Sequence, residues 1–167
     1  MVPEHSVPPK RQKRTILTII YVDADACPVK EETIRVSERH GLKVVFVANG
    51  GLRPSRNPLV EIRIVSQGAD AADDWIADNI SDKDICITAD IPLASRSLAK
   101  GARVIRPDGR LFDDANIGVA LAVRGLNQHL REANQVQTYN AAFSKADRSA
   151  FLDGLHRLVL SIRNSER

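Results

Sequence analysis

The chain has 167 residues, of which 43% are apolar and 27% are charged, as in an ordinary globular protein. This composition excludes a wholly disordered or collagen-like chain, and no apolar run approaches the roughly 20 residues needed to cross a bilayer. The two cysteines, Cys27 and Cys86, form no CxxC pair or metal-ligand cluster. They therefore predict a cytoplasmic protein without disulfides.

The net charge of +3 comes from the N-terminal segment. Residues 1–14 contain four basic residues and one acid, which leaves 20 basic and 20 acidic residues in the rest of the chain. The same segment holds three of the eight prolines and shows no apolar periodicity. We therefore predict a disordered basic arm over residues 1–14, followed by a single domain over residues 15–165.

Apolar runs alternate with helical patterns along the rest of the chain. Strands are predicted over residues 16–22, 43–48, 60–65, 84–88 and 103–106. Helices are predicted over residues 29–40, 70–80, 92–100, 115–131 and 145–162. This alternation predicts an α/β fold with a central, mostly parallel sheet of about five strands and additional C-terminal helices.

Acidic residues gather where predicted strands end and helices begin. Asp23 and Asp25 follow the first strand, and Asp90 follows the fourth strand two residues after Thr88. The helix after the third strand opens with three further acids, which are Asp70, Asp73 and Asp74. The carboxyl ends of parallel strands meet at one edge of a sheet, where ligands bind, so these side chains converge if the first and fourth strands are neighbours.

Clustered carboxylates repel one another unless a cation or a proton lies among them. Hard divalent cations bind carboxylate oxygens together with water and substrate phosphates. The pattern therefore favours a Mg²⁺ or Mn²⁺ site for phosphoryl transfer or nuclease chemistry, with Asp23, Asp25, Asp73, Asp74 and Asp90 as candidate ligands.

Three of these acids also have a purely structural interpretation as helix caps. Asp25 can cap the helix that begins near Pro28, Asp70 is a natural N-cap, and Asp90 can cap the helix that contains Pro92. Thr88 is either a ligand-positioning hydroxyl or an ordinary β-branched strand residue. The sequence leaves these alternatives open.

Three basic residues are candidate phosphate contacts. Lys30 follows the first acids on a new helix, and Arg53 and Arg56 lie in a loop over residues 49–58 that contains the flexible pair Gly50-Gly51. Solvated surface positions are the alternative for all three. Cys27 has no base nearby in the sequence and is expected to be a small buried residue, and Cys86 a core residue. His40, His129 and His156 are expected on helix surfaces.

Three ordered motifs resemble a known family. They are VDADACPVK over 22–30, GADAADDWI over 68–76 and ITADIPLA over 87–94. Two later blocks, NIGVALAVRGLNQHLR over 116–131 and FSKADRSAF over 143–151, resemble C-terminal blocks of the same family. This is the YaiI/YqxD family of uncharacterised bacterial proteins, which is placed among PIN-like domains. The resemblance covers residues 16–160.

The resemblance implies a three-layer α/β fold and a candidate activity. Many PIN-like domains are Mg²⁺- or Mn²⁺-dependent ribonucleases that use acids at strand ends, so RNA is the implied partner. Asp23 or Asp25 would then be the first metal ligand, Asp73 or Asp74 the acid on the second helix, and Asp90 the acid after the fourth strand. A shared fold does not by itself establish activity.

Two other functions compete with the nuclease. Asp23-x-Asp25 after an apolar strand also resembles the start of a haloacid-dehalogenase-type phosphatase, with Asp23 as nucleophile and Asp25 as acid/base. That family requires a lysine at a later junction, for which Lys100 is the nearest candidate. The other alternative is a domain that binds nucleic acid without cutting it.

Overall fold

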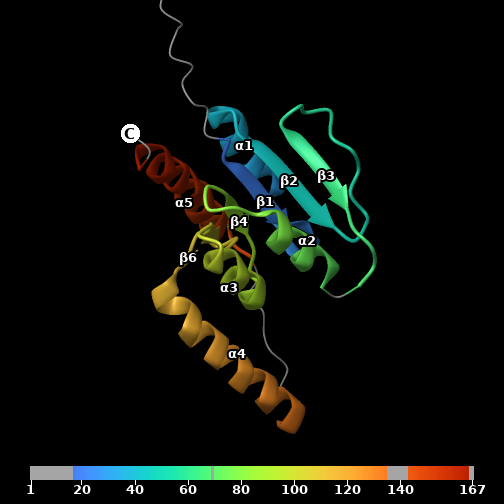
Figure 1. The fold of residues 1–167 in the computed structure, drawn as a ribbon, viewed down its shortest axis with the longest axis vertical. Coiled ribbons are helices and arrows are strands. Elements are labelled where there is room, and N and C mark those ends of the chain that lie inside the picture. Colours follow the sequence, from blue (N-terminus) through green and yellow to red (C-terminus); the bar gives the residue numbers. More distant parts are fainter. Residues whose placement is uncertain (1–16, 69, 135–142, 166–167) are drawn as a thin grey trace, which may run out of the picture.

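The computed structural model describes residues 17–68, 70–134 and 143–165, apart from the side chains of Ala26 and of residues 127–134 (Figure 1). The predicted basic arm over residues 1–14 lies outside the described residues. No helix in the described part of the chain is long and apolar enough to cross a membrane.

Six strands form one sheet in the order β3-β2-β1-β4-β5-β6. Their bounds are Ile19–Asp23 for β1, Lys43–Ala48 for β2, Val60–Ile64 for β3, Ile85–Ile87 for β4, Arg103–Ile105 for β5 and Leu111–Phe112 for β6. The first five are mutually parallel, and β6 pairs with β5 in antiparallel orientation. The predicted α/β class and the five predicted strands are confirmed. The short sixth strand was not predicted, because a two-residue strand carries no periodicity.

Helices cover both faces of this sheet (Figure 1). Their bounds are Lys30–His40 for α1, Ala71–Asn79 for α2, Ile91–Ala99 for α3, Asp114–Asn134 for α4 and Lys145–Asn164 for α5, and a 3₁₀ turn, η1, spans Ala24–Ala26. α1 and α5 pack on one face, whereas α2 and α3 pack on the other. α4 contacts α3 and projects away from the sheet.

The two faces use alternate residues of the same strands. On β1, Ile20 and Val22 point into the layer of α1 and α5, whereas Tyr21 points into the layer of α2 and α3. Strands buried on both faces need the nearly continuous apolar runs seen in the sequence. Phe151 on α5 is fully buried, and truncating such a side chain to alanine costs about 3–5 kcal/mol.

The helix ends follow local capping rules. α1 ends at Gly41, whose φ of 67° suits a residue without a Cβ atom. α5 begins with a reciprocal capping box, in which the Ser144 hydroxyl accepts from the Asp147 backbone and the Asp147 carboxylate accepts from the Ser144 backbone. Asp70 occupies the N-cap position of α2 as predicted, but its side chain makes no capping hydrogen bond.

Two predicted surface histidines are in fact paired. His40 at the end of α1 and His156 on α5 lie within hydrogen-bonding distance, with 2.8 Å between Nε2 and Nδ1. The side chain of the third, His129, lies outside the described residues. Both lie partly exposed on helix surfaces as predicted, but the contact between them was not predicted, because a single sequence does not show which helices pack together.

Candidate active site

The sheet changes winding direction between β1 and β4. From β1 the chain proceeds outward through β2 to β3, and from β4 it proceeds the other way through β5 to β6. The segment that leaves β1 enters α1 on one face, whereas the segment that leaves β4 enters α3 on the other. Open α/β sheets bind ligands where connections part in this way, and we call this region, at the carboxyl ends of β1 and β4, the carboxylate crevice.

A hydrogen-bonded chain of three residues crosses this crevice. Asp23 ends β1, and its Oδ2 accepts from the Thr88 hydroxyl at 3.2 Å. The same hydroxyl oxygen accepts from the Asp90 backbone N–H at 3.0 Å. Asp90 then caps α3 by accepting from the Leu93 N–H at 2.9 Å through Oδ1. Thr88 thus joins the two strand ends, and Asp90 is an N-cap beside the crevice.

Asp73 adds a third carboxylate from α2. It is half-buried in the first turn of the helix, and burial together with the charges of Asp90, Asp23 and Asp70 raises its pKa to about 7. The pKa of Asp23 is also raised, first by burial and then by Asp90 and Asp25, against the lowering effect of the Thr88 hydrogen bond. The structure therefore brings Asp90 close enough to Asp23 and Asp73 for its charge to oppose their ionisation.

Two of the predicted acids point elsewhere. Asp25 is exposed, and both its carboxylate oxygens lie 3.3–3.4 Å from the Asn49 backbone N–H at the end of β2. Asp74 is exposed and forms a 2.7 Å ion pair with Arg96 on α3. Asp73 and Asp74 thus have different surroundings despite being neighbours, as expected for residues about 100° apart on a helix.

The predicted basic contacts do not all lie at the carboxyl edge, because Arg56 precedes Asn57, whose side-chain amide donates to Glu38 in the last part of α1. Lys30 is the first residue of α1 and is half-buried. Arg53 and Arg56 are exposed in the loop that joins β2 to β3, and neither forms an ion pair within the described residues. Their roles in phosphate binding stay predictions.

The cysteine beside the crevice is not an activated nucleophile. Burial raises the pKa of Cys27 to about 11, against the lowering effects of a hydrogen bond with the Val29 backbone and of the Lys30 charge. A thiol with this pKa remains protonated at neutral pH. Cys86 is fully buried in β4, as predicted for a core residue.

The donor set of the crevice fits a hard divalent cation. Asp23, Asp73, Asp90 and the Thr88 hydroxyl offer only oxygen atoms, which Mg²⁺ and Mn²⁺ prefer. Among the described residues, no three His, Cys, Asp or Glu side chains are gathered tightly enough to enclose a metal ion as they stand. Mg²⁺ commonly takes only one or two protein carboxylates and fills its remaining positions with water and phosphate oxygens, so the open arrangement suits it.

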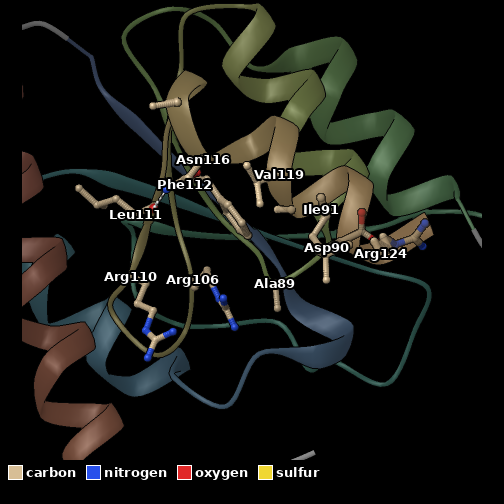
Figure 2. Close-up of a pocket in the computed structure, with 13 residues that line it drawn as sticks. Ala89, Asp90, Ile91, Arg106, Arg110, Leu111, Phe112, Asn116, Val119 and Arg124 are labelled. Atoms are coloured by element: carbon tan, nitrogen blue, oxygen red, sulfur yellow. Dashed lines mark hydrogen bonds between the residues drawn. The ribbon is translucent and has the colours of Figure 1, made fainter. Parts of the chain in front are cut away.

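Sequence reasoning missed a basic cavity beside these acids. Its volume is about 1020 Å³, and it is lined by Asp90, by residues of the β5–β6 hairpin and by α4 (Figure 2). Three arginines contribute to its wall, namely Arg106, Arg110 and Arg124. In the sequence, Pro107-Asp108-Gly109 indicates a turn with an arginine on either side. It does not indicate that α4 faces this turn.

Comparison with known proteins places the chain in a family. Residues 21–161 match the model of a family described as "Uncharacterized BCR, YaiI/YqxD family". A UPF0178 protein of Agrobacterium fabrum is 61% identical over 86% of this chain and 94% of its own length. A UPF0178 protein of Rhizobium meliloti is 59% identical over 87% of this chain and 99% of its own length.

No solved structure matches the chain significantly. The family match nevertheless includes every strand from the second half of β1 to β6, the carboxylate crevice and most of α5. The relatives at 61% and 59% identity cover nearly their whole lengths. The chain therefore belongs to the YaiI/YqxD family.

Proposed function

We propose that this protein is a divalent-metal-dependent nuclease that cleaves RNA at the crevice between β1 and β4. The observation that carries the proposal is the placement of Asp23, Thr88 and Asp90 at the switch point of the sheet, joined by hydrogen bonds of 3.2 and 3.0 Å. Asp73 lies near the same crevice, because the charges of Asp90 and Asp23 add to the effect of burial in raising its pKa. RNA as the substrate rests on the resemblance to PIN-like domains.

Asp23, Asp73 and Asp90 are the residues that would hold Mg²⁺ or Mn²⁺. When bound, such an ion activates water as a nucleophile and offsets charge on the phosphate. The Thr88 hydroxyl orients the Asp23 carboxylate by donating to Oδ2. Capping of α3 fixes Asp90, because its Oδ1 is held by the Leu93 N–H. These contacts hold two of the carboxylates in place before any ligand arrives.

The arrangement disfavours the phosphatase alternative. Asp25 would have to act as the acid/base beside Asp23, yet its carboxylate is directed to the Asn49 N–H. Lys100 follows the last residue of α3, whereas Asp90 precedes the first. Nine helical residues rise about 13 Å, so Lys100 lies at the opposite edge of the sheet from Asp23.

The proposal is tested by metal titration of Asp90→Asn against the wild type. Asparagine caps a helix as well as aspartate does, so the metal-free variant should unfold at the same temperature or a higher one. At a hundred times the dissociation constant, metal should stabilise the wild type by about 2.7 kcal/mol and the variant by much less. Cleavage of RNA should fall by orders of magnitude in the variant and stop on chelation.

Asp82→Asn is the matched control, because it removes one exposed carboxylate from the turn before β4, at the far edge of the sheet. It should keep both the metal response and the cleavage. A wild-type melting temperature that does not change in millimolar Mg²⁺ or Mn²⁺ would refute the metal site. RNA binding without turnover in either metal would instead establish the non-catalytic alternative.

A further inference from the structure

The basic cavity and the carboxylate crevice share one residue. Asp90 lies on the wall of the cavity, and its backbone N–H donates to the Thr88 hydroxyl, which in turn donates to Asp23 in the crevice. In Figure 2 the cavity extends from Asp90 and Ala89 toward the β5–β6 hairpin, with α4 on its other side. A chain-like ligand that occupies the cavity therefore reaches the proposed metal site at Asp90.

The charge of the cavity wall is positive. Arg106, Arg110 and Arg124 face one lining carboxylate, Asp90. Asp108 offsets part of this charge, at 3.4 Å from Arg106 Nη2 and 4.0 Å from Arg110 Nε. Each guanidinium has five N–H donors, and the Arg106 Nε–H has no partner among the described residues. These arginines therefore keep N–H donors and positive charge that an anionic ligand could use. The planar guanidinium group can donate two parallel hydrogen bonds to a phosphate.

Two of these arginines stand on a rigid hairpin. The turn between β5 and β6 closes through the Arg106 N–H to the Arg110 carbonyl at 2.8 Å. Gly109 in this turn has a φ of 88°, and a Cβ atom there would lie 2.6 Å from the backbone of Ala150 on α5. The hairpin therefore rests directly on α5, which fixes the positions from which Arg106 and Arg110 extend.

The opposite wall is apolar and open. Val119 and Val123 on α4 are 66% and 49% exposed, although they line the cavity. A free phosphate ion gains nothing from such a wall, whereas a nucleobase or ribose buries apolar surface against it. The volume of about 1020 Å³ is also that of a site for a large organic ligand.

We propose that this cavity binds a single RNA strand, with its phosphates on Arg106, Arg110 and Arg124 and its unpaired bases against α4. The proposal deepens the nuclease function and rests on it, since it places the strand so that a neighbouring phosphodiester lies at Asp90. An unpaired strand is specified because the bases of a duplex are stacked inside and cannot reach the valines of α4.

The test is the salt dependence of binding. Fluorescence anisotropy of a labelled single-stranded RNA of about 16 nucleotides would be measured in chelator, so that the strand stays intact. Arg110→Gln/Arg124→Gln removes two exposed charges of the cavity. Two lost phosphate contacts should flatten the slope of log K against log salt by about 1.4 and weaken binding about tenfold or more.

Arg35→Gln/Arg103→Gln is the matched control. It removes two exposed arginines, one on α1 and one at the amino end of β5, away from the cavity. Its slope should stay close to that of the wild type. Circular dichroism melts of both double variants should match the wild type, because the substituted side chains are exposed.

The outcomes separate this inference from the nuclease proposal. Arginine-dependent binding without metal-dependent cleavage would support the strand site and refute the nuclease. Equal slopes in the two double variants, or no binding of the wild type to RNA, would overturn the strand site. Equal affinity for a duplex, or displacement of the RNA by millimolar inorganic phosphate, would overturn the assignment to an unpaired strand.

Discussion

The two ends of the β1–β4 strand pair hold aspartates with opposite surroundings. At the amino end, Asp84 is 3% exposed and accepts hydrogen bonds from the Ile19 N–H at 3.0 Å, the Ser81 N–H at 2.9 Å and the Ser81 hydroxyl at 2.8 Å. At the carboxyl end, Asp23 is half-buried and accepts one long hydrogen bond from Thr88.

The difference separates a structural acid, Asp84, from Asp23, which we propose binds a metal ion. A buried carboxylate is tolerated when donors satisfy it, and the three donors around Asp84 tie the start of β1 to the turn before β4. Asp23 has fewer donors, and nearby Asp90 and Asp25 raise its pKa. Asp23 is partly buried, has few hydrogen-bond donors and lies near like charges, and each of these lowers the stability of the metal-free protein. A bound cation would offset this loss of stability.

The largest effect is expected at the amino end. Asp84→Ala leaves the Ile19 N–H without its partner and frees the turn at Ser81, so it should lower the free energy of unfolding by about 3 kcal/mol, with or without metal. Urea denaturation measures this. Asp82→Ala, an exposed neighbour in the same turn, should change stability by less than about 0.5 kcal/mol. Similar free energies of unfolding for the two variants would contradict the structural role of Asp84.

The opposite result is expected at the carboxyl end. Asp23→Asn keeps an acceptor for the Thr88 hydroxyl and removes one of the opposed charges. The metal-free variant should be as stable as the wild type or more stable, by about 1 kcal/mol at most. Its stabilisation by Mg²⁺ or Mn²⁺ should disappear. If metal-free Asp23→Asn lost as much stability as Asp84→Ala, the aspartates at the two ends of the β1–β4 pair would both be structural.

Most of the fold could be predicted from the sequence because its elements have strong local signals. The strand β2 was predicted at its observed bounds, where the apolar run over residues 44–48 follows Lys43 and ends at the glycine-rich loop. The sequence did not predict the order of the strands. It indicated only that the acids converge if β1 and β4 are neighbours, as they are in the structure. The unpredicted parts depend on contacts distant in sequence, such as the 2.8 Å approach of His40 and His156.

The site was predictable as a region but not as a set of side-chain directions. Strand ends and helix starts place Asp23, Asp73 and Asp90 at one edge, as the sequence indicated. The orientations of Asp25 toward Asn49 and of Asp74 toward Arg96 depend on neighbouring segments that no local pattern identifies. The arginine cavity was missed for the same reason, since it exists only where α4 faces the hairpin.

The pH dependence of stability sharpens the comparison at Asp73. Its pKa is about 7 in the folded protein against an ordinary value of 3.8, so the folded state binds more protons between these values. The Asp73 contribution to metal-free stability should therefore be full near pH 4 and lost as the pH rises to about 7. Asp73→Asn should remove that decline and raise stability at pH 8 by about 1 kcal/mol, a value reduced for the partial exposure of the side chain.

Asp74→Asn is the control for this measurement. It changes the adjacent residue, which is exposed and paired with Arg96, so the pH profile of the wild type should persist in shape. Metal should also release protons at pH 6.5 from the wild type and not from Asp73→Asn, because a bound cation favours the ionised carboxylate. Calorimetry in buffers of different ionisation enthalpy measures that release, and equal release from both proteins would exclude Asp73.

The smallest effect comes from the histidine pair, and it must be separated from that of Asp73 because it has the opposite sign. Burial lowers the pKa of His40, and Arg163, His156 and Arg39 lower it further. The unfolded chain then binds more protons near and below pH 6.5, so the His40 contribution is present above pH 6.5 and lost as the pH falls.

His156→Gln removes one of the charges that act on His40 and keeps a polar side chain beside it. The decline in stability on acidification below pH 6.5 should become shallower, while the decline attributed to Asp73 on alkalinisation should stay the same. Denaturation curves from pH 5 to pH 8 for His156→Gln, Asp73→Asn and the double variant would test this. The residues lie on opposite faces of the sheet, so the two changes should add. A double variant that departs from additivity would show that the carboxylate crevice and the α1–α5 layer are coupled through the sheet.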